Sequence, residues 1–159
     1  MAEFYFAYGS NMNPIRMAAR DMQYDHAQLG ILENYCLRFN KRASDLANAG
    51  YANVEPSEGE NVEGILYRLT DSQQIYKMDP FEGVPTLYTR ESMLIETLAE
   101  GVIESWVYVA HPQRIDNSLK PEAWYLDHLL AGKPYLTESY FEKLTRVEVQ
   151  PNSIDADPW

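Results

Sequence analysis

The side chain best placed for acid–base chemistry in this sequence is that of Glu82. It lies in the segment 79–85, Asp-Pro-Phe-Glu-Gly-Val-Pro, where two prolines restrict the backbone and a glycine allows a close approach. Beside an aromatic ring, such a carboxylate can lose part of its hydration, which would raise its pKa towards the range that a general acid–base needs. A solvated glutamate on a helix-to-strand turn fits the same residues, because most glutamates lie at the surface.

A second candidate for chemistry is the turn Gly9-Ser10-Asn11. It follows an aromatic and apolar stretch, residues 4–8, which predicts a strand buried on both faces. Asn13 and Pro14 then predict the N-cap and first position of a helix. Such a strand–turn–helix directs backbone N–H groups and a helix dipole to one spot, where a carboxylate or an oxyanion can bind. A plain tight turn is the alternative, since the sequence lacks the lysine of a P-loop and the glycines of a dinucleotide fingerprint.

Other side chains that could do chemistry have simpler interpretations. Ser10 could be a nucleophile, but no His–Asp pair is recognisable for it, so a binding or turn role is favoured. For Tyr8 we expect the backbone to matter more than the ring, and Cys36 is expected to be inert in the core. Asp79, which precedes a proline, is interpreted as a turn or cap residue. Three further tyrosines can line a pocket or belong to the core: Tyr88, Tyr108 and Tyr140. Three histidines lack the spacing of metal ligands: His26, His111 and His128.

Two stretches of the sequence resemble the γ-glutamylcyclotransferase-like (AIG2-like) family. The first, from Phe6 to Met12, reads Phe-Ala-Tyr-Gly-Ser-Asn-Met, and the second is Asp79 followed by Glu82-Gly-Val. Weaker similarity extends along most of the chain, but not beyond Pro151. The resemblance implies that Glu82 is the catalytic acid–base. It also implies that the substrate contacts a second set of residues: Tyr8, Gly9, Ser10, Asn11 and Tyr88.

The activity implied by this resemblance is the cyclisation of a γ-glutamyl amide. The α-amine of the substrate attacks the side-chain carbonyl, which forms 5-oxoproline and releases an amino acid or an amine. Because the nucleophile is tethered, effective molarity supplies much of the acceleration, and we expect no cofactor and no metal. Two alternatives stay open: a binding or regulatory protein without turnover, and removal of a γ-glutamyl group from a larger amine. Glutathione-specific relatives resemble the chain less, since they carry leucine at the position of Asn11.

The composition limits the partners of the protein. The chain has 159 residues, 45% of them hydrophobic, and a formal net charge of -11, which disfavours a nucleic-acid partner. A single cysteine excludes an intrachain disulfide. The sequence shows no secretory signal and no stretch of membrane-spanning length, so we expect a cytoplasmic protein without a membrane partner. A small-molecule γ-glutamyl substrate is the expected partner, and the oligomeric state is not predicted.

The elements that must position these residues predict an α+β fold on a largely antiparallel sheet. Such a sheet could close into a barrel, and the resemblance implies a small mixed barrel with helices packed outside. We expect one domain over residues 1–151 and a C-terminal tail over 152–159. A capping box at Thr70–Gln73 predicts a helix that ends near Met78. The remaining elements are expected as strands at 28–40, 51–54, 62–69, 87–96, 102–110 and 145–150, loops at 41–50 and 56–61 (a hairpin), and helices at 14–21, 121–131 and 137–144.

Overall fold

The fold is built on two long strands, β2 (Tyr24–Arg42) and β3 (Gly50–Leu69), which pair antiparallel along most of their length. The structure, a computed structural model, describes residues 3–44, 46 and 48–153. The pairing of β2 with β3 changes register at three places. Such irregularities bend and twist a strand pair, so one long ribbon can curve round far enough to form most of a barrel wall.

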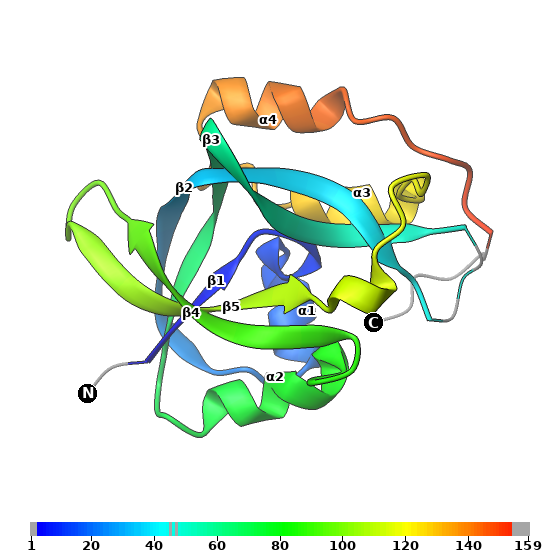
Figure 1. Ribbon diagram of the computed structural model, residues 1–159. Helices are drawn as coiled ribbons and strands as arrows, with labels where there is room; N and C mark the ends of the chain where they lie inside the picture. The colour runs from blue at the N-terminus through cyan, green and yellow to red at the C-terminus, as the bar shows by residue number, and fades with distance from the viewer. Residues whose placement is uncertain (1–2, 45, 47, 154–159) are drawn as a thin grey trace.

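β1 (Glu3–Ala7) closes this sheet into a barrel with the strand order β1-β3-β2-β4-β5. It pairs antiparallel with β3 on one side and parallel with β5 (Val102–Ala110) on the other. β4 (Tyr88–Glu96) pairs antiparallel with β2 and β5, and the β4–β5 hairpin extends beyond the rest of the barrel in Figure 1. The predicted α+β fold, with a small and largely antiparallel barrel, is confirmed.

Two glycines let the barrel close around Phe6. Gly30 and Gly64 are directly paired across β2 and β3. A Cβ on Gly30 would lie 3.1 Å from the Phe6 ring and 2.7 Å from Ile95, and a Cβ on Gly64 would lie 2.3 Å from the carbonyl oxygen of Ala7. The buried Phe6 ring therefore fills space that two side chains would otherwise need.

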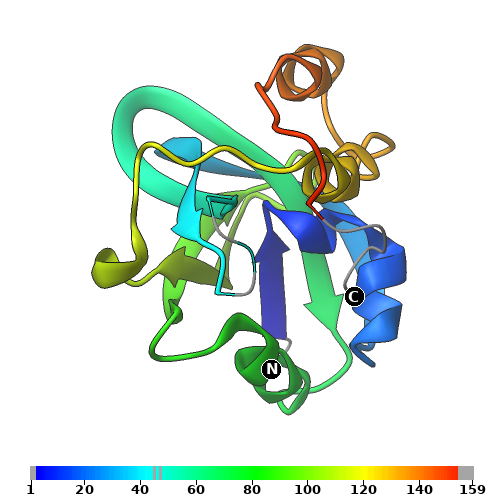
Figure 2. The same ribbon diagram turned by 90° about the vertical axis from the view of Figure 1, so that its right-hand side faces the viewer.

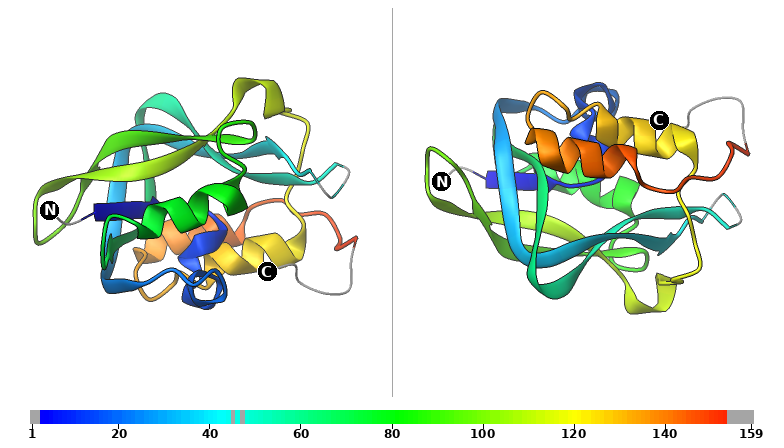
Figure 3. Two further views of the ribbon diagram at one scale, coloured as in Figure 1. Left: turned by 90° about the horizontal axis from the view of Figure 1, so that it is seen from below. Right: turned by 90° about the horizontal axis from the view of Figure 1, so that it is seen from above.

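Within the described residues, four α-helices cover the outside of the barrel. Figure 1 shows α4 over β2 and β3 on one side and α2 on the opposite side, and in Figure 2 β1 leads towards the turn before α1. α3 and α4 lie next to each other, as Figure 3 shows from above. The bounds are α1 Pro14–Ala19, α2 Gln74–Glu82, α3 Ala123–Leu130 and α4 Glu138–Thr145, with short 3-10 helices η1 (Ser10–Met12) and η2 (Pro112–Arg114).

The prediction of a hairpin loop at residues 56–61 is wrong. β3 continues through this stretch and both of its halves pair with β2, so the chain bends without reversing its direction. The turn-forming residues are accommodated in an irregularity of the strand pair. There Asn34 has a φ of 62°, and its Oδ1 accepts a hydrogen bond from Gly59 N at 3.0 Å.

Two smaller predictions are also wrong. The capping box at Thr70–Gln73 does not form, because the Asp71 carboxylate accepts the hydrogen bond from Gln73 N at 2.9 Å and α2 begins only after this local turn. The strand predicted at 145–150 is reduced to an isolated bridge between Glu122 and Gln150. Both errors concern short segments of about four to six residues.

The last described residues pack against the start of α3. Trp124 N donates to Asn152 Oδ1 at 2.9 Å, and Ser153 N donates to Glu122 Oε1 at 3.0 Å. The rest of the predicted tail, residues 154–159, lies outside the described residues. In the described part of the chain, no helix has the length and apolar character needed to cross a membrane.

Candidate functional site

The turn predicted to bind an anion lies directly after β1. It begins at Gly9 and continues into η1, after which Asn13 Oδ1 caps α1 by accepting a hydrogen bond from Ile15 N at 3.1 Å. Gly9 packs against β3, since a Cβ on it would lie 3.0 Å from the Cβ of Ala52. A residue without a side chain is therefore needed to bring this turn close to β3.

Asn11 connects the turn to Glu82. It is 2% exposed, and its Nδ2 donates to Tyr5 Oη at 2.9 Å and to Glu82 Oε1 at 3.4 Å. Its Oδ1 accepts from Arg20 Nη1 at 3.3 Å, and its backbone carbonyl accepts from Tyr67 Oη at 2.7 Å. These contacts fix the orientation of the amide, because its oxygen faces the arginine while its nitrogen faces the carboxylate.

Glu82 is the last residue of α2, which corrects the prediction that it lies in a turn. Residues 79–82 are helical although Pro80 is among them, and Gly83 ends the helix with a φ of 66°. The buried face of α2, which includes Met78, packs on the core. This packing outweighs the helix-breaking effect of one proline, and the left-handed cap explains the glycine.

Glu82 lies in a half-buried and cationic environment. Its side chain is 16% exposed, and its Oε1 is 3.8 Å from Arg20 Nη1. Burial raises the pKa of Glu82 above the usual range of a glutamate, whereas Arg20, Arg16 and Lys41 oppose this rise and Asp79 adds to it. Desolvation therefore outweighs the attraction of the cations. Such a carboxylate exchanges a proton at neutral pH more readily than an ordinary glutamate does.

Three cationic residues close to Glu82 were not predicted from the sequence. Arg16 and Arg20 are four residues apart and share one face of α1 and its C-terminal cap. This spacing, directly after the predicted turn, is the signal that could have revealed them. Lys41 was assigned to a loop, but it belongs to β2 and pairs with Tyr51 of β3. Its local sequence carries no comparable signal.

The residues that the sequence singled out meet in a cavity of about 40 Å³, called here the small cavity. All six of them line it: Tyr8, Gly9, Ser10, Asn11, Glu82 and Tyr88. A neighbouring space of about 220 Å³, the cationic cavity, is lined by Arg16, Arg20 and Lys41. Four residues line both spaces and mark their junction: Ser10, Glu82, Tyr88 and Tyr125. Among the described residues, no group of three or more His, Cys, Asp or Glu could hold a metal ion.

Tyrosine hydroxyls hold the walls of the small cavity in place. Tyr88 Oη donates to the carbonyl oxygen of Ala52 at 2.8 Å, and Tyr125 Oη accepts from Ala52 N at 2.9 Å. The Tyr8 hydroxyl donates to the carbonyl oxygen of Tyr108. Burial raises the pKa of Tyr125 to about 12, so its hydroxyl stays protonated at neutral pH. The hydroxyls of Tyr8 and Tyr88 are thus engaged with the backbone, and their rings shape the site.

Asp79 and Tyr108 anchor the helix that carries Glu82. Asp79 was predicted as a turn or cap residue, but it lies inside α2, where its Oδ1 accepts from Tyr108 Oη at 2.7 Å and is 3.0 Å from Arg90 Nε. α2 is therefore tied to β4 and β5 close to its C-terminal end. Of the tyrosines considered from the sequence, Tyr108 lines the small cavity, whereas Tyr140 lines a different one.

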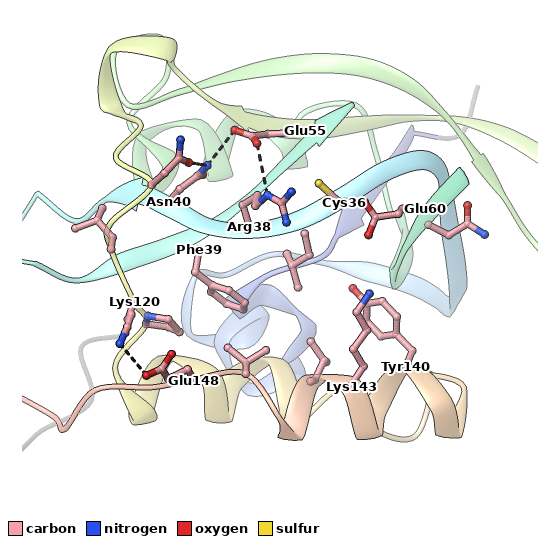
Figure 4. A pocket seen from close by; sticks show the side chains of 17 residues that line it. Cys36, Arg38, Phe39, Asn40, Glu55, Glu60, Lys120, Tyr140, Lys143 and Glu148 are labelled. Atoms are coloured by element: carbon pink, nitrogen blue, oxygen red, sulfur yellow. Dashed lines mark hydrogen bonds and ion pairs between the residues drawn. The ribbon is translucent and has the colours of Figure 1, made fainter. Parts of the chain in front are cut away.

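A third cavity, of about 640 Å³ and larger than the two beside Glu82, has no Glu82 in its lining. Figure 4 shows it on the outside of the barrel. It is a groove between β2 and α4. Charged side chains along it pair with one another: Arg38 Nε is 3.7 Å from Glu55 Oε1, and Lys120 Nζ is 2.8 Å from Glu148 Oε1. Because none of the six residues predicted for catalysis or substrate binding lines this groove, its volume alone does not make it the functional site.

A comparison with protein families identifies the chain. Residues 5–126 match the family described as "Gamma-glutamyl cyclotransferase, AIG2-like". The chain belongs to this family. The matched range of this γ-glutamyl cyclotransferase, AIG2-like chain includes the turn after β1, Glu82 and the three cationic residues around it.

Solved structures share the fold of this γ-glutamyl cyclotransferase, AIG2-like chain. One described as "Gamma-glutamyl cyclotransferase" is 24% identical, with a TM-score of 0.82 over 99% of this chain and 93% of that one. The uncharacterized protein LOC79017 from Homo sapiens is also 24% identical, with a TM-score of 0.82 over 98% of this chain and 92% of the other. A glutathione-specific γ-glutamyl cyclotransferase from yeast is 14% identical, with a TM-score of 0.64 over 90% of this chain and 93% of that one. A comparison with curated proteins gave no significant match.

Proposed function

We propose that this protein is a γ-glutamyl cyclotransferase, which converts a small γ-glutamyl amide into 5-oxoproline and a free amino acid or amine. The observation that carries the proposal is the position of Glu82, a half-buried carboxylate with a raised pKa at the junction of two cavities and beside the turn after β1. Membership of the family supports the same class of reaction. The scissile amide of the substrate then lies at this junction.

Glu82 carries protons in this reaction. Its carboxylate accepts a proton from the α-ammonium of the substrate, and the freed amine attacks the γ-carbonyl carbon to form the C–N bond of the ring. The protonated Glu82 then donates to the departing nitrogen as the original amide bond breaks. In total the ring nitrogen loses two protons and the departing nitrogen gains two. The reaction therefore consumes no proton and no water, and its tethered nucleophile lowers the entropic cost of attack.

The turn after β1 stabilises the negative charge that develops on the γ-carbonyl oxygen. Gly9, Ser10 and Asn11 line the small cavity, and their backbone N–H groups make no hydrogen bond to another described residue. A donor aimed at a developing oxyanion contributes about 3 kcal/mol to a transition state. The same groups, with the amide of Asn11, offer donors for the α-carboxylate of the substrate.

The test is a direct measurement of 5-oxoproline. Purified protein and its Glu82→Gln variant are incubated with γ-glutamyl-amino acids, γ-glutamyl-amines and glutathione, with Glu148→Gln as a matched control on the surface. We expect product from the wild type and the control, and a loss of about 100-fold or more in Glu82→Gln. Equal product from all three forms would remove Glu82 from the mechanism. No product from any folded form would contradict cyclotransfer of these substrates and favour a binding protein.

A further inference from the structure

The last turn of α2, which carries Glu82, is held by fewer backbone hydrogen bonds than an ordinary helical turn. Pro80 lies inside α2 and has no N–H group, so it cannot donate to the carbonyl oxygen of Tyr76 four residues earlier. The helix is capped soon after this proline, at Gly83. The position of Glu82 therefore depends more than usual on side-chain contacts between α2 and the barrel.

Asp79 makes such a contact from the residue directly before Pro80. Its Oδ1 accepts a hydrogen bond from Tyr108 Oη at 2.7 Å and lies 3.0 Å from Arg90 Nε. Arg90 of β4 and Tyr108 of β5 are directly opposite each other in the sheet. Because directly opposite residues project their side chains from the same face, the β4–β5 pair offers a guanidinium group and a hydroxyl group side by side to one carboxylate.

Arg90 is itself fixed between two aromatic rings. The central carbon of its guanidinium group lies 4.3 Å from the centre of the Trp106 ring on β5 and 5.1 Å from that of the Tyr76 ring on α2. Arg90 thus contacts α2 at two residues, Tyr76 and Asp79. The side chains of Arg90 and Asp79 are only 17% and 20% exposed. An ion pair that is shielded from water and stacked in this way is stronger and better defined than a pair on the surface.

We propose that Arg90 is a positioning residue for Glu82: it neutralises Asp79 and holds the last turn of α2, so that the Glu82 carboxylate stays at the junction of the two cavities. Arg90 is not among the described residues that line either cavity, so it acts through Asp79 and not through contact with the substrate. The inference rests on the proposed function, since it assigns to Arg90 a part in the proton transfer by Glu82.

The same ion pair affects the proton affinity of Glu82. Burial is the main cause of the raised pKa of Glu82, and the negative charge of Asp79 adds to the rise. Without Arg90 the charge of Asp79 is no longer offset, so the pKa of Glu82 rises further; without the charge of Asp79 this pKa falls. A helix that merely loosens would move the pKa in the same direction in both cases. The other charged or titratable groups around Glu82 are kept in both substitutions: Arg16, Arg20, Lys41, Tyr5, Tyr8, Tyr88, Tyr108 and Tyr125.

The experiment breaks the ion pair from each end. Arg90→Met, Arg90→Lys and Asp79→Asn are compared with the wild type by a carbon NMR titration of the Glu82 carboxyl group. The same variants are compared by kcat and KM for the formation of 5-oxoproline from γ-glutamyl-L-alanine. Arg68→Met and Asp25→Asn are the matched controls, because they break an arginine–aspartate pair on the exposed outside of the barrel.

We expect the pKa of Glu82 to rise by about 0.5 or more in Arg90→Met and to fall in Asp79→Asn. Above the acid limb of the pH profile, kcat of Arg90→Met should fall about tenfold with little change in KM, because a displaced Glu82 transfers protons poorly to a substrate that still binds. Arg90→Lys keeps the charge but not the planar group, so it should restore the pKa and only part of kcat. The controls should match the wild type.

The outcomes separate this inference from the proposed function. Shifts of the pKa in one direction in both variants, or no shift in either, overturn the inference, and so does an unchanged kcat in Arg90→Met. If the wild type forms no 5-oxoproline from any γ-glutamyl substrate, the proposed function fails, and the NMR titration still decides the inference because it requires no turnover. Should Arg90→Met not fold, Asp79→Asn and Arg90→Lys provide the test, and an unchanged pKa in Asp79→Asn overturns the inference.

Discussion

Replacement of Arg20 by methionine tests the electrostatic account of Glu82. Arg20 is the strongest of the influences that oppose the rise in the pKa of Glu82, and its Nη1 is 3.8 Å from Glu82 Oε1. Without this cation, the protonated form of Glu82 is favoured further and its pKa rises. In the proposed mechanism Glu82 must be ionised to take the first proton, so we expect the acid limb of the kcat/KM profile to move to higher pH.

The size of the effect follows from the separation of the charges. Two unit charges 3.8 Å apart attract by about 4 kcal/mol at an effective dielectric constant of about 20. Arg16 and Lys41 remain and compensate in part. If about a third of the attraction is lost, kcat/KM falls by up to about tenfold at pH values on the acid limb and recovers as the pH rises. The substitution also removes the partner of Asn11 Oδ1, which costs about 1–3 kcal/mol of stability.

Two measurements check this prediction. The first is the pH profile of 5-oxoproline formation, and the second is a carbon NMR titration of the Glu82 carboxyl group, which does not depend on turnover. Arg68→Met is the control, since Arg68 Nε pairs with Asp25 Oδ1 at 2.6 Å on the exposed outside of the barrel. An acid limb and a titration that stay in place in Arg20→Met, or move to lower pH, would refute the reasoning.

Three further predictions concern stability and packing. Because burial raises the pKa of Glu82, the folded protein binds the proton of this residue more tightly than the unfolded chain does, so Glu82 lowers the stability of the fold as the pH rises through the folded pKa. Urea unfolding should therefore show that Glu82→Gln gains more stability at pH 7 than at pH 4. An equal gain at both pH values would contradict this. Gly9→Ala would bring a Cβ to 3.0 Å from Ala52 Cβ, and we expect a loss of about 1–3 kcal/mol in urea unfolding together with reduced turnover. Gly64→Ala would meet the carbonyl oxygen of Ala7 at 2.3 Å, so thermal melting should show a loss of about 3 kcal/mol or more, and an unchanged melting temperature would exclude the tight closure of β1 on β3.

Much of the candidate site could be predicted because its signals are local. A strand end, turn residues, an N-cap at Asn13 and a proline follow one another within a few positions, and each restricts the backbone without help from the rest of the chain. The same locality made the positions of α1, α3 and α4 predictable. Where two local signals competed, as at Asp71 and Gln73 before α2, the wrong one was chosen.

The other errors and the omissions concern contacts between distant segments. Turn residues at 56–61 indicated a hairpin, but pairing with β2 holds both halves of β3 in one continuous strand. Asp79 looked like a turn residue, yet it binds Tyr108 and Arg90 from inside a helix. In each case long-range pairing or packing outweighed a local preference, which tertiary context commonly does.

The sequence by itself determined the fold class, the turn after β1 and the choice of Glu82 as the candidate acid–base, because these depend on periodicity, turn chemistry and two short motifs. Only the tertiary structure decided that Glu82 is half-buried at a junction of two cavities, and that Arg16, Arg20 and Lys41 lie around it. The pKa of a carboxylate depends on its desolvation and on its distances to other charges. Both are set when the barrel closes and brings distant segments together, so neither can be read from a single stretch of the sequence.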